Sequence, residues 1–195
     1  TGQASRKKCR IVAAQTRDKF PRNKEDLYSP TVNSEFVRLI LAISLECDCS
    51  ISTFDVAGGV LTAEYDDVEF GPLYVKIPSN LEEVLKDRKD LIPRLQNGRI
   101  AKYAKVKRSL YGARASPLIF FRKYRDFIIK PENEGGPGFT QSKIDPCCFY
   151  KRGNCGDGST HGLTEEPSIE NMKNSFGLVS AHVDDALLSF SNDQE

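Results

Sequence analysis

Three aspartates, far apart in the sequence, have surroundings that suit cation-binding carboxylates. Asp184 and Asp185 interrupt an apolar stretch that runs from residue 176 to residue 190, and Asp55 follows a separate apolar segment. Burying an unpaired carboxylate is costly unless a cation compensates its charge. If the three carboxylates met at neighbouring strand ends, they would hold divalent ions, and Mg²⁺ prefers such oxygen ligands. Spacing alone does not show that Asp55 meets the pair, and a surface turn is the alternative for Asp184 and Asp185.

Alternating apolar and polar residues predict the strands that would position these acids. Residues 51–56 alternate and run into the turn signal Ala57-Gly58-Gly59, so Asp55 is predicted near the end of a strand. Its side chain is expected on the face opposite Phe54 and Val56. Two apolar runs flank Asp184 and Asp185, which predicts a β-hairpin with the acids at its tip.

Two helices are predicted to pack against these strands. The first is expected to be capped by Ser34, and its apolar face would contain Phe36, Leu39, Ile40 and Ile43. The second begins at Ser116, and its apolar stripe would contain Pro117, Phe120, Phe121, Tyr124, Phe127 and Ile128. Further strands are predicted at 7–14, 73–78 and 146–151, and a loop insertion at 153–175. Strands mixed with two packing helices indicate an α+β domain.

The net charge of +1 conceals a strong segregation of charge along the chain. Residues 1–24 contain eight basic side chains and one acid, and residues 99–125 contain nine basic side chains and no acid. Residues 157–195 reverse this balance, with eight acids and one lysine. Two basic blocks and an acidic remainder suit a surface that holds phosphates beside a site that holds cations. A set of solvated charged faces is the alternative explanation.

Composition and cysteine usage favour a globular chain inside the cell. No apolar run reaches the roughly 18 residues of a membrane span, and no signal peptide opens the sequence. We therefore expect no membrane partner and no secretion. The six cysteines do not suggest a disulfide framework, so reduced structural thiols are expected. A zinc site is conceivable, but the spacing matches no common ligand pattern; its ligands would be Cys147, Cys148, Cys155 and His161.

Seven blocks of this sequence, in unbroken order, resemble the reverse transcriptase domain of Ty1/copia-type retrotransposons. The sequence KRSLYGARASP at 107–117 closely resembles the family's "KSLYGLKQSP" signature, and HVDD at 182–185 resembles its "YVDD" hairpin. The other blocks are the basic strand at 8–13, the segment at 28–45, the first catalytic motif at 54–56, the strand at 73–78 and the "GF…S..DPC" block at 138–147. Together these blocks cover nearly the whole chain.

The resemblance implies the α+β fold of a right-hand polymerase, with an antiparallel sheet packed on helices. Residues 1–195 would be a fragment of the fingers and palm. The fingers are expected at approximately 1–45 and 72–110, and the palm at approximately 46–71 and 111–195. The thumb would be absent from this fragment and would lie, with a ribonuclease H domain, beyond Glu195. The isolated fragment is therefore expected to have weak activity or none, in a cytoplasmic virus-like particle or the nucleus.

The resemblance also implies an activity and its catalytic residues. The family's metal-binding triad falls on Asp55, Asp184 and Asp185, and the Val56 backbone carbonyl would be an additional ligand. These groups would hold two Mg²⁺ ions, for which Mn²⁺ could substitute. The implied reaction extends a primer on an RNA or DNA template from deoxynucleoside triphosphates.

Further positions match the family's binding residues. The expected nucleotide-binding residues are Lys8, Arg10, Val60, Tyr111 and Gly112. The expected nucleic-acid-binding residues are Lys105, Lys107, Arg108, Ser116, Pro117 and His182. Lys8 and Arg10 could instead be solvated charges on an edge strand, and Ser116-Pro117 is sufficiently explained as a helix start.

Three departures from the family pattern leave alternatives open. Val60 stands where an aromatic residue blocks the ribose 2′-hydroxyl, Ala115 where glutamine is usual, and His182 where tyrosine is usual. A degenerate, non-catalytic retroelement remnant that only binds nucleic acid is therefore the first alternative. The second is an unrelated interaction module whose acid pair is a surface turn.

Overall fold

The computed structural model describes residues 12–13, 27–152 and 176–191, and these form two compact units. The first unit comprises residues 1–27 and 60–119, and the second comprises residues 28–59 and 120–195. The expected boundaries placed residues 28–45 with the fingers. In the structure this segment belongs to the second unit, because its helix packs on the strands of that unit.

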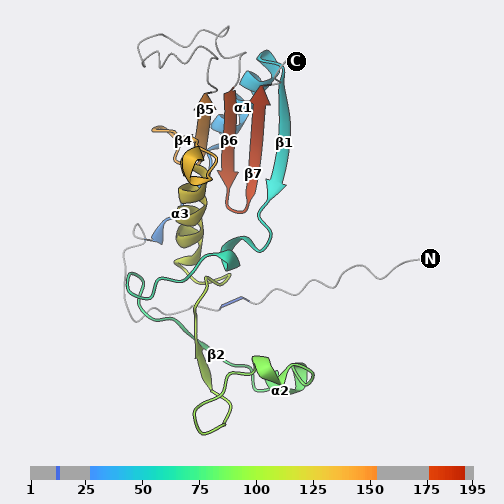
Figure 1. Ribbon diagram of the computed structural model, residues 1–195, viewed down its shortest axis with the longest axis vertical. Helices are drawn as coiled ribbons and strands as arrows, with labels where there is room; N and C mark the ends of the chain where they lie inside the picture. The colour runs from blue at the N-terminus through green and yellow to red at the C-terminus, as the bar shows by residue number, and fades with distance from the viewer. Residues whose placement is uncertain (1–11, 14–26, 153–175, 192–195) are drawn as a thin grey trace, which may run out of the picture. The chain divides into compact units, whose positions relative to one another are not determined.

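The second unit is built on a five-stranded antiparallel sheet (Figure 1). Its strand order is β1-β7-β6-β5-β4, so β1 and β4 form the two edges. The strands are β1 (Cys49–Asp55), β4 (Thr140–Gln141), β5 (Cys148–Arg152), β6 (Phe176–His182) and β7 (Asp185–Ser191). The predicted strand at 51–56 and the predicted hairpin around the acid pair are confirmed as β1 and as β6 with β7.

One face of the sheet forms the apolar core of this unit. The helix α3 (Ser116–Ile128) contributes Tyr124 and Ile128, which pack with Phe149 of β5 and Val179 of β6. Phe54 of β1 packs against this cluster, so Phe54 lies on the core face and Asp55 on the other. Burial of Tyr124 raises the pKa of its hydroxyl to about 12.

The helix α1 (Ser34–Glu46) covers the opposite face of the sheet. It packs on β1 and β7, and the hydroxyl of its buried Ser44 lies 2.6 Å from that of Ser189. Ser189 and Asp185 lie four residues apart on β7. They share a face because every second side chain along a strand points the same way. The face that α1 covers is therefore the face that carries Asp55 and Asp185.

The first unit contains a two-stranded ribbon and short helical turns. β2 (Tyr74–Lys76) pairs with β3 (Tyr103–Lys105) in antiparallel register. The charged connection between them contains the short helix α2 (Leu81–Val84) and the 3₁₀ turn η3 (Lys89–Leu91). Another 3₁₀ turn, η2 (Gly59–Thr62), lies where the second unit passes into the first. The 3₁₀ turn η4 (Glu132–Glu134) belongs to the second unit. A small core of Ala63, Phe70, Ala115 and Ile119 holds this unit together.

Three details differ from the sequence predictions. Asn33, and not Ser34, is the N-cap of α1, and its side chain accepts a hydrogen bond from the Glu35 N–H at 3.0 Å. Leu39 was predicted in the core but is 51% exposed, because Val37, Ile40 and Ser44 make the helix face toward the sheet. Phe127 is likewise 58% exposed, since the buried row of α3 runs through Phe120, Tyr124 and Ile128.

Some expectations fall on residues that the structure does not describe. They include most of the strand at 7–14 and the loop insertion at 153–175. Within the described ranges, no helix combines the length and apolar character needed to cross a membrane.

Candidate functional site

Two of the three candidate aspartates and His182 form a row across three neighbouring strands. Asp55, the last residue of β1, pairs with Asp185, the first residue of β7. Asp185 in turn pairs with His182, the last residue of β6. Residues directly opposite each other in an antiparallel pair project from the same face, with Cβ atoms about 4.5–5.5 Å apart. The three side chains therefore stand side by side at one end of the sheet.

The tight turn between β6 and β7 sets this register. It consists of Val183 and Asp184, and Val183 has a positive φ of 59°, which is rare for a β-branched residue. A positive φ at the first central residue only is the pattern of the type II′ turn, which suits the twist of a hairpin. The Val56 N–H donates to the Asp184 carbonyl at 2.9 Å, so the end of β1 is tied to this turn.

Asp184 points to a different neighbour, the glycine turn that follows β1. Gly59 has a φ of 24°, and a Cβ built on it would lie 2.9 Å from Asp184 Cβ and 3.2 Å from Asp184 Oδ2. Only a glycine allows this close approach. The Gly59 N–H donates to the Val56 carbonyl at 2.7 Å. That carbonyl, expected from the sequence as a cation ligand, has a second lone pair beyond this bond.

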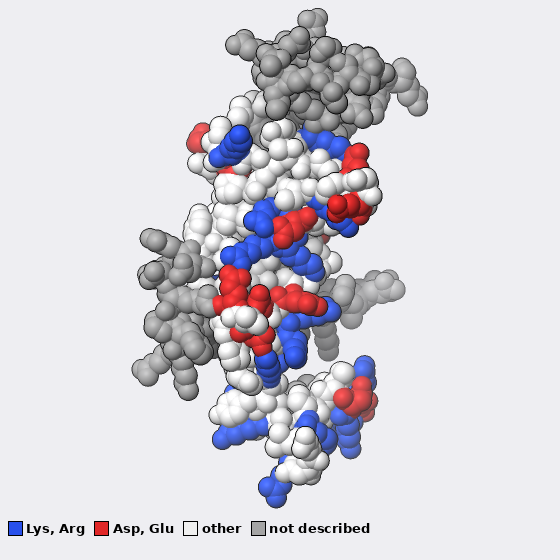
Figure 2. Space-filling model, turned by 60° about the vertical axis from the view of Figure 1, so that its left-hand side comes forward, with Lys and Arg blue, Asp and Glu red and all other residues white. Residues whose placement is uncertain are grey.

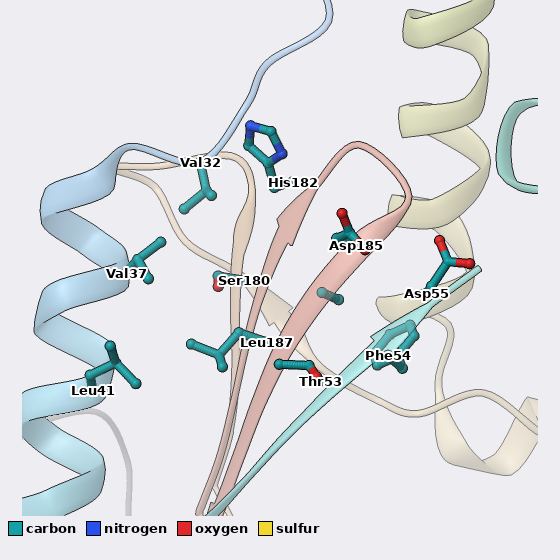
Figure 3. Close-up of a pocket in the computed structure, with 11 residues that line it drawn as sticks. Val32, Val37, Leu41, Thr53, Phe54, Asp55, Ser180, His182, Asp185 and Leu187 are labelled. Carbon is teal, nitrogen blue, oxygen red and sulfur yellow. The ribbon is translucent and has the colours of Figure 1, made fainter. Parts of the chain in front are cut away.

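A pocket of about 510 Å³ extends from the row of side chains along the sheet. Val37 and Leu41 of α1 and the preceding Val32 form its apolar wall, as Figure 3 shows. Its floor consists of Thr53, Ser180 and Leu187, and Asp55, Asp185 and His182 lie at one end. Sequence reasoning missed the floor residues. The strand alternation could have found them, because each lies two residues from a member of the row.

The apolar surroundings of the acids suggested carboxylates that are partly buried, but Asp55 and Asp185 are exposed at the end of the sheet, so water screens their charges. Like charges directly opposite across two strands are destabilising, and Asp55 and Asp185 are in that relation. Their carboxylate oxygens are the donors that Mg²⁺ and Mn²⁺ prefer, so the donor chemistry fits such an ion. Among the described residues, however, no three His, Cys, Asp or Glu side chains lie close enough together to hold a metal ion. The expected triad is thus divided: two carboxylates share the row, and Asp184 packs against Gly59.

Asp145, a buried carboxylate from the "DPC" block, supports the pocket wall. Its Oδ2 accepts a hydrogen bond from the Asn33 N–H at 2.9 Å, and its Oδ1 accepts one from the Cys147 N–H at 2.8 Å. Asn33 is the N-cap of α1, so Asp145 fixes the start of this helix to the turn before β5. No sequence pattern predicts this role of Asp145, because a buried acceptor for backbone amides leaves no characteristic spacing.

The predicted nucleic-acid contacts of the first unit divide into exposed and buried groups. Lys105, Lys107 and Arg108 are exposed, and Lys105 forms an ion pair with Asp67. Ser116 is buried, and its hydroxyl accepts a hydrogen bond from the Leu110 N–H at 3.1 Å. Ser116 therefore has a structural role here, while the adjacent Pro117 is exposed, and contact of either residue with nucleic acid stays a prediction.

The expected nucleotide-binding positions also have structural functions where they are described. The Tyr111 carbonyl accepts a hydrogen bond from the Ala13 N–H at 2.7 Å. Gly112 has a φ of 84°, and a Cβ there would lie 2.2 Å from the Ala13 carbonyl oxygen. Val60 is 4% exposed in the first unit. Lys8 and Arg10 lie outside the described residues.

Two members of the conceivable zinc site are buried thiols. Cys147 and Cys148 are not disulfide-bonded, and burial raises the pKa of each to about 12. The other two candidates, Cys155 and His161, lie outside the described residues.

Comparison with known proteins finds a similarity to a retroelement protein. The chain is 22% identical over 147 residues to the "Retrovirus-related Pol polyprotein from transposon TNT 1-94" of Nicotiana tabacum. The match covers 75% of this chain but 9% of the relative, so the chain spans about a tenth of the length of that polyprotein. No family model matches the chain. No solved structure matches it either. The similarity supports a retrotransposon origin for this chain.

Proposed function

We propose that this chain is part of an RNA-directed DNA polymerase, the reverse transcriptase of a copia-type retroelement. The observation that carries the proposal is the pairing of Asp55 with Asp185 at adjoining strand ends. The two carboxylates come from distant parts of the sequence and lie directly opposite each other, and a cation bound between them would relieve their mutual repulsion. The similarity to a retrotransposon Pol polyprotein supports the same assignment.

In this proposal some residues of the site bind the cation, and others hold those residues in place. Asp55 and Asp185 would hold the cation, and Asp184 would join them after its side chain turns away from Gly59. Bound Mg²⁺ or Mn²⁺ supplies stabilisation of charge at the reacting phosphate and activation of the attacking primer hydroxyl. The Val56–Asp184 hydrogen bond holds the end of β1 against the turn and so keeps the acids in register. Nucleotidyl transfer depends mainly on such positioning and charge neutralisation.

Primer extension on an RNA template tests the proposal, with the chain and with any longer polypeptide that contains it. We expect Asp55→Asn and Asp185→Asn each to lower the rate by about 10²–10³-fold, as when one electrostatic group of an active site is removed. Asp126→Asn is the matched control, since Asp126 is an exposed acid of the same unit, paired with Arg125. A rate unchanged by Asp185→Asn would remove this residue from the catalytic site.

A non-catalytic, nucleic-acid-binding remnant is the second candidate. The observation that favours it is that no three potential ligands are gathered among the described residues. The departures at Val60 and Ala115 agree with it. Salt-sensitive binding of primer–template without metal-dependent nucleotide incorporation would identify this case.

A further inference from the structure

The ribbon of β2 and β3 has one apolar face and one face of tyrosine and lysine. The pairing continues beyond both strands, because the Ile77 N–H donates to the Lys102 carbonyl and the Val106 N–H donates to the Leu73 carbonyl. The residues of one face are half-buried or buried: Leu73, Val75, Ile77, Ala104 and Val106. The residues of the other face are all exposed: Tyr74, Lys76, Tyr103 and Lys105.

The pairing register arranges the exposed face as an alternating pattern. Tyr74 is directly opposite Lys105, and Lys76 is directly opposite Tyr103. The two tyrosines are therefore diagonal neighbours, a relation in which Cα atoms lie about 7–8 Å apart. Each ring has a lysine beside it along its own strand and another across the ribbon. The face thus presents two aromatic rings separated and flanked by positive charge.

Both rings are accessible to a ligand. Tyr74 is 58% exposed and Tyr103 is 54% exposed. The backbone of Lys102 belongs to the apolar face, but its ammonium reaches over the ring of Tyr103, 5.9 Å from the ring centroid, so a cation lies beside this ring. The fold does not need these rings for its core, because the apolar side chains of the opposite face supply the packing of the ribbon.

Positive charge around the rings suits a phosphate backbone. Lys105 is paired with Asp67, so we expect Lys76 and Lys102 to make the main phosphate contacts. Lys107 and Arg108 follow on the same segment and are also exposed. Figure 2 shows several Lys and Arg side chains on the surface of the part that carries β2 and α2, together with a smaller group of acidic side chains.

We propose that this face of the β2–β3 ribbon is a binding platform for single-stranded nucleic acid, with unpaired bases stacking on Tyr74 and Tyr103 and phosphates bound by Lys76 and Lys102. Exposed aromatic rings interleaved with lysines are the arrangement that binds single strands without sequence preference. A duplex gains little from such rings, because its bases already stack on one another. The proposal deepens the proposed function, since it rests on that function for the assignment of the ligand as unpaired template.

Fluorescence anisotropy of a labelled single-stranded oligothymidylate tests the platform with the full chain and without metal ions or nucleotides. We expect Tyr74→Ala and Tyr103→Ala each to weaken binding about tenfold, because each removes one stacking surface. The corresponding Tyr→Phe variants keep the ring and should bind as the unaltered chain does. Lys76→Gln should reduce the slope of log affinity against log salt concentration by about one, because one phosphate contact is lost. Tyr150→Ala, an exposed tyrosine of β5, is the matched control and should bind normally.

The outcomes separate the platform from simpler explanations. Unchanged affinity in the Tyr74→Ala/Tyr103→Ala double variant overturns the proposal, and so does an equal loss of affinity for a duplex of the same length. Equal losses in the Phe and Ala variants overturn stacking as the mechanism. If urea unfolding shows that the double Ala variant is not folded, the Tyr74→Leu/Tyr103→Leu variant, which keeps apolar bulk without an aromatic ring, gives the answer. Failure of the polymerase assignment appears separately, as absence of incorporation with binding intact.

Discussion

Asp55 and Asp185 face each other across the antiparallel pairing of β1 with β7, at the end of the sheet where the hairpin turns. Asp185 has His182 as its partner on the other side, so one carboxylate stands between an imidazole and a second carboxylate. Most sheets avoid like charges in directly opposed positions. The relationship between these two residues therefore underlies both the expected stability of the chain and its expected affinity for cations.

Removing one of the opposed charges should stabilise the chain when no divalent cation is present. We expect Asp55→Asn, measured by urea unfolding in EDTA, to raise the free energy of unfolding by about 0.2–1 kcal/mol. The gain should shrink at high salt, because ions screen exposed charges. Asp126→Asn should show no such gain, since Asp126 is paired with Arg125. A loss of stability in Asp55→Asn would mean that Asp55 makes a favourable contact that the pairing does not reveal.

The glycine turn after β1 should tolerate alanine at one position better than at the next. Gly58 and Gly59 both have positive φ, so alanine at either position carries a backbone cost of about 1–2 kcal/mol. A Cβ at Gly58 meets nothing within 4 Å, whereas a Cβ at Gly59 meets Asp184 at 2.9 Å. We expect Gly59→Ala to lower the free energy of unfolding by about 1–3 kcal/mol more than Gly58→Ala does. Equal losses in urea unfolding would show that Asp184 does not pack on this turn.

Loss of the Asp145 carboxylate should loosen the start of α1. Asp145→Ala leaves the N–H groups of Asn33 and Cys147 without their acceptor. The Cys147 amide is buried, and a buried amide without a partner costs about 1–3 kcal/mol, so the urea midpoint should fall; the part-buried Asn33 amide, which water can reach, adds less. The matched exposed variant Asp126→Ala should change stability by less than about 0.5 kcal/mol. If both variants behave alike, Asp145 does not anchor the helix.

The buried thiols should make the chain less stable in alkali. Burial raises the pKa of Cys147 from 9.0 to about 12, so between these values the folded chain keeps a proton that the unfolded chain releases. The free energy of unfolding should therefore be unaffected below pH 9 and fall as the pH rises toward 12, by at most about 1.4 kcal/mol per pH unit for this thiol. Cys147→Ala should flatten the decline. An unchanged slope in that variant would show that its thiol ionises alike in both states.

Local pattern was sufficient to predict the elements that carry the acids. Alternation along residues 51–56 and the apolar runs around the acid pair predicted β1 and the hairpin, and each lies where expected. Local pattern could not predict that β1 pairs with β7, because that register depends on contacts between distant segments. The acids were expected to meet from the family resemblance, and the structure shows Asp55 beside Asp185.

Other features could not be predicted because two neighbouring residues, or two sides of one helix, match the same sequence pattern. Asn33 and Ser34 are both good capping residues; Asn33 is the cap, and its backbone N–H also donates to Asp145, a contact that the sequence does not reveal. Leu39 and Phe127 match the helical spacing of buried residues, but the sheet covers a narrower stripe of each helix than the sequence offers. The structural role of Ser116 was hidden because its partner, the Leu110 N–H, belongs to an irregular loop.

Paramagnetic broadening by Mn²⁺ in NMR spectra of the chain is the most direct test of the cation site. At low Mn²⁺ concentration we expect selective broadening of the amide signals of Val56, His182 and residues 184–186, with signals of α3 near Asp126 unaffected. Asp185→Asn should abolish this selectivity while leaving the remaining spectrum in place. Uniform weak broadening, or selective broadening that persists in Asp185→Asn, would contradict a divalent-cation site built on the Asp55–Asp185 pair.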